Sequence, residues 1–180
     1  MPRYAAFIRA VNLGRNRRVS GAELRSLFEE LGLDGVASFR TSGNVVFETG
    51  REARGKLNER IEEHLEQALG HAAAVFLRTE SEIRAIAAHE PFEHKLVARS
   101  KGKVQVVLLS AKPAAGAREK ALALATDDDR LAFGDRELYW LPSAGTQDSG
   151  LDQKELGRLL GSTTVRTKGT VEHLAAKYFG

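Results

Sequence analysis

The chain has 180 residues, of which 42% are hydrophobic and 28% are charged, a globular composition that excludes an intrinsically disordered chain. It contains no cysteine, which excludes disulfide bonds, thiolate catalysis and cysteine-ligated zinc, and favours a reducing compartment such as the cytoplasm. The net charge of +3 is too small to indicate a partner. No stretch approaches the roughly 18 apolar residues of a membrane span, so we expect no membrane contact.

The first half of the chain predicts the element order βαββαβ. Its strands are expected over residues 4–11, 36–41, 44–48 and 73–77. The first helix begins after Ser20, which has the spacing of a capping box with Glu23. The second helix carries apolar residues at every fourth position from residue 57 to residue 69. A short extra helix follows, because Thr79 and Glu82 repeat the capping-box spacing.

The second half predicts the same order. Its strands are expected over residues 104–109, 130–133, 137–141 and 163–166. One helix starts after Pro113, and another contains Leu151 and Leu156 and stops at Gly161. A closing helix is expected around residues 171–178.

The repeated order predicts an α+β protein made of two ferredoxin-like halves in tandem, with an extra C-terminal helix. The expected domains are residues 1–92 and 103–180. Residues 93–102, a polar and basic stretch, form the expected linker.

Several standard chemistries are not supported by the sequence. There is no Walker-type phosphate loop, and no two histidines have the spacing of a metal site, so we expect no metal and no cofactor. The third strand of the first half, Asn44–Glu48, lacks the paired aromatic residues with which an RNA-recognition module stacks bases.

Basic residues are concentrated in two stretches that contain no acid. The first, residues 1–22, contains five arginines. The second, residues 94–118, contains Lys95, Arg99, Lys101, Lys103, Lys112 and Arg118. Either the two stretches meet and attract an anion such as phosphate, or they are solvated charges in separate loops.

A polar set follows the first strand, where Arg9, Asn12, Gly14 and Asn16 come within eight residues. Arginine in an apolar strand costs free energy unless it is paired. The set is either a polar binding loop, or a structural feature in which Arg9 pairs with a carboxylate such as Glu48.

Residues 7–14 read Phe-Ile-Arg-Ala-Val-Asn-Leu-Gly, with Asn16 behind them, and residues 41–47 read Thr-Ser-Gly-Asn-Val-Val-Phe. These segments resemble the opening and the hairpin of the bacterial domain of unknown function 1697 family. Gly145, Ser149 and Leu151, and then residues 164–171, resemble its later motifs in the same order. The resemblance implies two ferredoxin-like halves and no known function.

The chain departs from the family pattern at three positions. Ala10 replaces a glycine, Gly150 replaces a lysine, and Lys168 replaces a tryptophan. A ligand that needs those groups would be lost or altered. Thr167 replaces an asparagine, and since both residues cap helices well, the closing helix is still expected to begin there.

The loop and the family motifs together select a set of candidate ligand-binding residues, rich in hydrogen-bond donors and without an obvious general base. They are Arg9, Asn12, Gly14, Asn16, Ser42, Asn44, Arg166 and Thr170. The set favours a binding module for an anionic or phosphate-bearing ligand, a nucleotide or a nucleic acid.

Two other interpretations stay open. One is a small hydrolase or transferase that acts on a phosphorylated or acidic metabolite, with Arg9 holding the phosphate and Asn44 orienting water, by analogy with acylphosphatases. The other is that the polar set only maintains contact between the halves. The sequence names neither a catalytic residue nor an oligomeric state.

Overall fold

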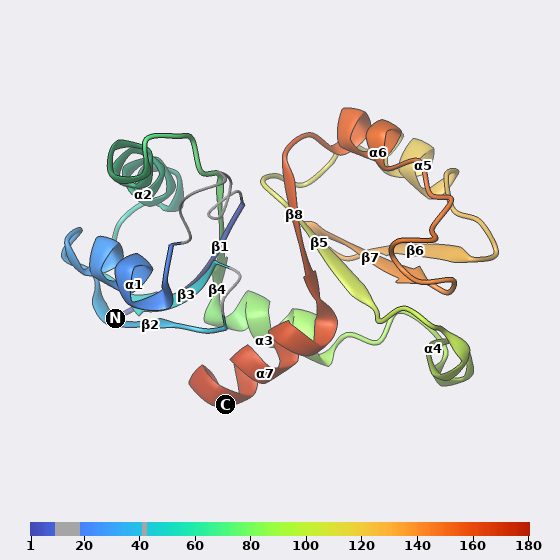
Figure 1. Ribbon diagram of the computed structural model, residues 1–180, viewed down its shortest axis with the longest axis horizontal. Coiled ribbons are helices and arrows are strands. Elements are labelled where there is room, and N and C mark those ends of the chain that lie inside the picture. Colours follow the sequence, from blue (N-terminus) through green and yellow to red (C-terminus); the bar gives the residue numbers. More distant parts are fainter. Residues whose placement is uncertain (10–18, 41–42) are drawn as a thin grey trace. The chain divides into compact units, whose positions relative to one another are not determined.

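The computed structural model describes residues 1–9, 19–40 and 43–180, which form alternating strands and helices (Figure 1). They divide into two compact units. The first contains Met1–Arg84 and Leu174–Gly180, and the second contains Ala85–His173. Each unit is built on one four-stranded antiparallel sheet, so the α+β class predicted from the sequence is confirmed.

The first sheet has β1 and β3 in its centre. Its strands are β1 (Arg3–Ile8), β2 (Asp34–Ser38), β3 (Asn44–Glu48) and β4 (Val75–Thr79). They pair in the order β2-β3-β1-β4. Successive strand residues point to opposite faces, and Tyr4, Ala6 and Ile8 of β1 all enter the same core. Of the first predicted strand, residues 4–8 are confirmed, and residues 10–11 lie outside the described part.

Two helices cover one face of this sheet, α1 (Gly21–Glu29) and α2 (Arg54–Leu69). The Oγ atom of Ser20 caps α1 by accepting a hydrogen bond from the N–H of Glu23 at 3.1 Å, as predicted. Residues of α2 four positions apart share one helix face and are fully buried: Leu57, Ile61 and Leu65. Gly70 then ends α2 with a φ of +78°.

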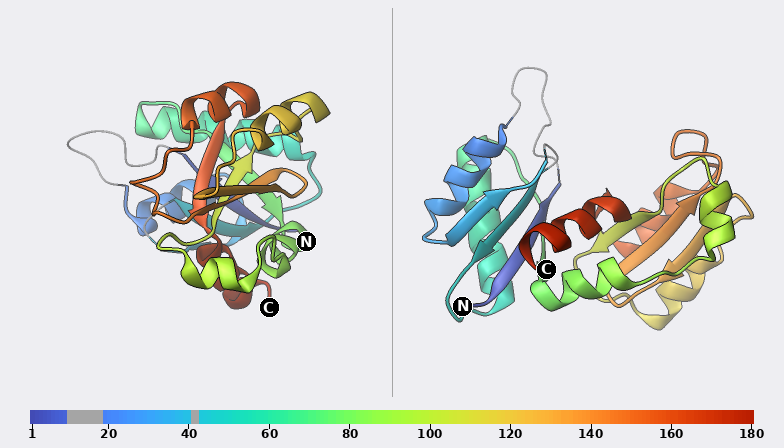
Figure 2. Two further views of the ribbon diagram at one scale, coloured as in Figure 1. Left: turned by 90° about the vertical axis from the view of Figure 1, so that its right-hand side faces the viewer. Right: turned by 90° about the horizontal axis from the view of Figure 1, so that it is seen from below.

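The second unit repeats the order of strands and helices. Its strands are β5 (Gln105–Leu109), β6 (Asp129–Phe133), β7 (Glu137–Pro142) and β8 (Thr163–Thr167), paired in the order β6-β7-β5-β8. Helices α5 (Ala115–Leu122) and α6 (Gln153–Leu160) pack Ala121 and Leu156 against one face of the sheet. Figure 2 shows this pair of helices on its sheet.

Three further helices lie outside this repeat: α3 (Glu80–Ala88), α4 (His94–Arg99) and α7 (Lys168–Tyr178). The predicted capping box of α3 is confirmed. The N–H of Glu82 donates to Thr79 Oγ1 at 3.3 Å, and the N–H of Thr79 donates to Glu82 Oε2 at 2.8 Å.

Helix α4 occupies the segment 93–102 that the sequence predicts as a linker. It buries none of its residues, so it has no apolar periodicity by which the sequence could reveal it. The compact units also divide between Arg84 and Ala85, inside α3, and the end of α7 belongs to the first unit. The predicted domains, residues 1–92 and 103–180, stay a prediction.

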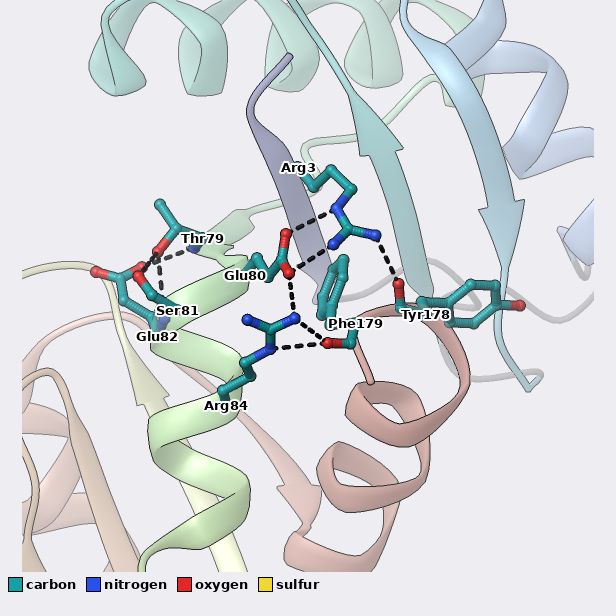
Figure 3. Close-up of polar contacts among 8 residues, drawn as sticks. All are labelled: Arg3, Thr79, Glu80, Ser81, Glu82, Arg84, Tyr178 and Phe179. Carbon is teal, nitrogen blue, oxygen red and sulfur yellow. Dashed lines mark hydrogen bonds and ion pairs between the residues drawn. The ribbon is translucent and has the colours of Figure 1, made fainter.

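A polar cluster holds the end of α7 within the first unit (Figure 3). Arg3 donates from Nε and Nη2 to the two carboxylate oxygens of Glu80, at 2.7 and 2.5 Å, and from Nη1 to the carbonyl of Tyr178 at 3.0 Å. Arg84 binds Glu80 at 2.5 Å and donates from Nε to the carbonyl of Phe179 at 2.7 Å. The terminal carbonyls of a helix carry partial negative charge, so cations are favourable there.

One glycine inside α6 and one at its C-terminal cap give opposite predictions. A methyl group would meet nothing within 4 Å at either, but Gly157 is helical, whereas Gly161 has a φ of +77°. We expect Gly157→Ala to raise the free energy of unfolding by about 1 kcal/mol, because alanine favours the helix over glycine. Gly161→Ala should lower it by about 1–3 kcal/mol, because its backbone conformation favours glycine. Urea unfolding measures both, and a destabilised Gly157→Ala would contradict the first expectation.

Candidate functional site

Half of the predicted ligand-binding residues lie outside the described residues: Asn12, Gly14, Asn16 and Ser42. The others fall in different compact units. Arg9 and Asn44 belong to the first, and Arg166 and Thr170 belong to the second. A common site for the eight residues therefore stays a prediction.

Arg9 is exposed and follows β1, which ends at Ile8, so it is not the buried strand arginine that the sequence indicates. Its backbone N–H donates to the carbonyl of Ala74 at 2.9 Å. Glu48, the partner suggested for Arg9 in the structural interpretation, lies opposite Arg3 at the other end of the strand. That pair is therefore not formed, and the guanidinium group of Arg9 reaches solvent.

Asn44 has a structural role in the connection between β2 and β3. Its side chain is 1% exposed, and Nδ2 donates to the carbonyl of Phe39 at 3.0 Å. The N–H of Phe39 in turn donates to the carbonyl of Asn44 at 2.8 Å. One donor of this buried amide is therefore used within the hairpin, which weakens its predicted role in orienting water.

Arg166 and Thr170 lie at the end of β8 and the start of α7. Nη1 of Arg166 donates to Thr164 Oγ1 at 2.8 Å and to the carbonyl of Val165 at 2.9 Å. Burial lowers the pKa of Arg166 to about 10. The N–H of Thr170 donates to Thr167 Oγ1 at 3.2 Å, which confirms Thr167 as the predicted cap of the closing helix.

A cavity of about 460 Å³ opens in the second unit beside the start of α7. Its basic lining residues are His94, Lys101, Lys103 and Lys168. Its apolar lining residues are Pro91, Phe92, Val97 and Val104. Glu90 and Glu172 also line it, so three lysines face two carboxylates and the cavity carries a small positive charge.

Two of the lysines are held by the Lys-Gly-Lys segment, residues 101–103. The N–H of Lys101 donates to the carbonyl of Ser143 at 2.9 Å. A Cβ atom at Gly102 would lie 2.3 Å from the carbonyl oxygen of Pro142 and 3.2 Å from the Cα of Gly145. Only glycine permits so close an approach. The backbone that carries both lysines is therefore packed tightly against the turn after β7.

The third lysine, Lys168, is the first residue of α7, and its side chain is 10% exposed. Its Nζ donates to the carbonyl of Ala87 at 3.0 Å and to Glu172 Oε1 at 2.9 Å. Gly169 follows it and also lines the cavity. At this helix start the N–H of Lys168 donates to the carbonyl of Val104 at 2.8 Å and the N–H of Thr170 donates to Thr167 Oγ1. The helix therefore adds only the partial positive charge of its first turn to the charge of the lysines.

A buried carboxylate anchors the loop that follows β7. Asp129 is 1% exposed, and its Oδ1 accepts hydrogen bonds from Trp140 Nε1 at 2.9 Å and from Ser149 Oγ at 2.6 Å. The Oγ of Ser149 also accepts from the N–H of Leu151 at 3.1 Å. Ser149 and Leu151, taken as family motifs in the sequence, thus fix the end of this loop.

Sequence reasoning did not select the lysines of the cavity. Lys101 and Lys103 were seen only as part of a basic stretch, and Lys168 only as a departure from a family pattern. The signal that could have found them is Gly102 between two lysines, because a glycine outside a turn or a helix end often marks a close approach of two backbones. Lys168 has no such signal, since α7 brings it to the cavity.

Within residues 1–9, 19–40 and 43–180, no three histidine, aspartate or glutamate side chains gather in a group suited to a metal ion. In the same part of the chain, no helix combines the length and the apolar character that crossing a lipid bilayer requires.

A model of one protein family matches residues 1–139. The chain belongs to the DUF1697 family of proteins of unknown function. The two most specific motifs found in the sequence, residues 7–14 and 41–47, lie inside the matched span, and the resemblance is confirmed. No curated protein matches the chain.

The DUF1697 chain is similar in fold to the conserved bacterial protein SP0830 from Streptococcus pneumoniae, with a TM-score of 0.76. The similarity covers 100% of this chain and 99% of the other, at 21% sequence identity. At this identity the likeness concerns the fold alone.

The network around Asp129 predicts a large loss of stability in the DUF1697 protein when its carboxylate is removed. We expect Asp129→Ala to lower the free energy of unfolding by about 2–4 kcal/mol, because it leaves the buried Trp140 Nε1 and Ser149 Oγ without their acceptor. Asp128→Ala is a matched control, since this neighbour is exposed. It should change the stability by less than about 0.5 kcal/mol. Equal losses in the two variants, measured by urea unfolding, would contradict the role of the network.

The lowered pKa of Arg166 predicts a pH-dependent stability. Above about pH 10 the unfolded chain binds more protons at this residue than the folded chain, because the pKa of Arg166 is lower in the folded chain, so its contribution to stability rises with pH there. The free energy of unfolding of the wild type relative to Arg166→Met should therefore increase between about pH 9 and about pH 11. A difference between the wild type and Arg166→Met that stays constant over this pH range would contradict the expectation.

Proposed function

We propose that the second unit of this DUF1697 protein binds a small phosphate-bearing ligand in the cavity beside the start of α7. The observation that carries the proposal is the position of Lys101, Lys103 and Lys168 around one cavity. Ammonium groups bind phosphate oxygens through strong charge-assisted hydrogen bonds. Positively charged side chains and the start of a helix together form a favourable environment for an anion.

The way the lysines are held supports binding over a purely structural role. Lys168 already has two acceptors, so its charge is fixed in place at the wall of the cavity. The Lys-Gly-Lys segment is fixed through its backbone instead, by Lys101 and by the tight packing of Gly102. An anion in the cavity gains a favourable charge interaction with each lysine that it approaches.

The size and the lining of the cavity indicate what kind of ligand it accepts. A volume of about 460 Å³ falls in the range of about 300–1,000 Å³ that is typical of small-molecule sites. Phe92 and Val97 give it an apolar side, which suits the uncharged part of a metabolite. The geometry therefore favours a phosphorylated metabolite or a single nucleotide over a nucleic-acid duplex.

We also infer that each unit contains a ferredoxin-like half, in agreement with the element order read from the sequence. The support is that both sheets have the same order of strands, β2-β3-β1-β4 and β6-β7-β5-β8. Two helices cover one face of each sheet. Such a sheet with helices on one face is the arrangement of a split βαβ unit.

The proposal is tested with inorganic pyrophosphate as the probe and isothermal titration calorimetry as the measurement. We expect binding that weakens as the salt concentration rises, because exposed charges are screened. The double variant Lys101→Ala/Lys103→Ala should bind at least about tenfold more weakly, since each charged hydrogen bond contributes about 1.5–3 kcal/mol.

The control removes the same amount of charge elsewhere. Lys95 on α4 and Lys154 on α6 are exposed and lie outside the lining of the cavity. The variant Lys95→Ala/Lys154→Ala should bind pyrophosphate as the wild type does. Equal weakening of both double variants would reduce the effect to net charge, and no binding by the wild type would refute the proposal.

A further inference from the structure

A second cavity, of about 360 Å³, adjoins the proposed phosphate site. The two cavities share the Lys-Gly-Lys segment, residues 101–103, as part of their lining. The other side of the second cavity is formed by Gln105 of β5 and by the loop residues Thr146, Gln147 and Asp148. The two cavities therefore border each other at this segment.

The loop that lines the second cavity is anchored on both sides of residues 146–148. Before them, the N–H of Gly145 donates to the carbonyl of Pro142 at 2.8 Å, and Ser143 accepts from Lys101. After them, Ser149 binds the buried Asp129 at 2.6 Å. Exposed side chains on a loop held in this way lose less conformational freedom on binding than those on an unanchored loop.

The side chains of this second cavity differ in kind from those of the first. They supply one hydroxyl, two amides and one carboxylate, and no aromatic ring lines the cavity. The amide of Gln105 is oriented, because its Nε2 donates to the carbonyl of Lys103 at 2.9 Å. Amides and carboxylates are suited to the hydroxyl groups of a ligand, which both donate and accept hydrogen bonds. A nucleobase would instead need an aromatic or apolar face on which to stack.

We propose that the second cavity binds the hydroxyl-bearing part of the same ligand, so that the ligand is a phosphorylated sugar or polyol. This inference rests on the proposed function. The carboxylate of Asp148 accepts hydrogen bonds from hydroxyl groups and repels phosphate. It therefore sets the direction of the ligand, with the phosphate beside Lys168 and the hydroxyl groups beside the loop.

The experiment compares affinities for inorganic phosphate, ribose phosphate, glucose phosphate and adenosine monophosphate by calorimetry. We expect a sugar phosphate to bind at least about tenfold more tightly than inorganic phosphate, which corresponds to one additional strong polar contact. Asp148→Ala should weaken the sugar phosphate about tenfold. The same change should not weaken inorganic phosphate, because it removes a negative charge near the site.

Asp127→Ala is the matched control, since it removes the same charge from an exposed residue that does not line the cavity. It should leave the affinity for the sugar phosphate unchanged. If phosphate binds but no sugar phosphate binds more tightly, or if Asp148→Ala and Asp127→Ala act alike, this inference is wrong and the proposed function stands. Tightest binding of the nucleotide also overturns it. If no phosphate compound binds, the proposed function itself fails, and this inference with it.

Discussion

Two arginines of the first unit bind the carbonyl groups at the end of α7, and the position of the C-terminal residues depends on these hydrogen bonds. Arg3 lies on the first strand and Arg84 lies on α3, and Glu80 binds both guanidinium groups. The glutamate offsets the repulsion between the two cations, so both can lie at the negative end of one helix. As a result the chain returns to the unit in which it began, and α7 contributes its start to one unit and its end to the other.

Close packing at glycine determines where the charges of the proposed site lie. Gly102 allows the backbone of the Lys-Gly-Lys segment to touch the turn after β7, and Gly145 is part of that turn. The same turn begins the loop that Asp129 anchors further on through Ser149. Lysines are flexible side chains that usually lie free in solvent, but their backbone positions are fixed here. A fixed backbone leaves less conformational freedom to be lost when these lysines bind the ligand that we propose.

Much of the fold could be predicted from particular residues. Two helix starts are predicted by capping boxes, formed by Ser20 with Glu23 and by Thr79 with Glu82. Two helix ends are predicted by Gly70 and Gly161. These predictions succeed because a helix cap depends on residues that are neighbours in the sequence. Helix α4 was missed since it buries no side chain and leaves no periodic pattern. The hydrogen bond between Arg3 and Tyr178 could not be predicted, since no local signal reports a contact between residues so far apart.

The sequence by itself determined the repeated order of strands and helices, the helix caps, and membership of the DUF1697 family. Each of these depends on residues that are close together in the sequence or on motifs that occur in a fixed order. Only the tertiary structure decided which polar residues share a cavity. It placed Asn44 in a hairpin and left Arg9 exposed, and it brought Lys168 beside Lys101 and Lys103 across more than sixty positions of the chain. Which side chains line one cavity depends on how helices and sheets pack, and this packing involves residues far apart in the sequence.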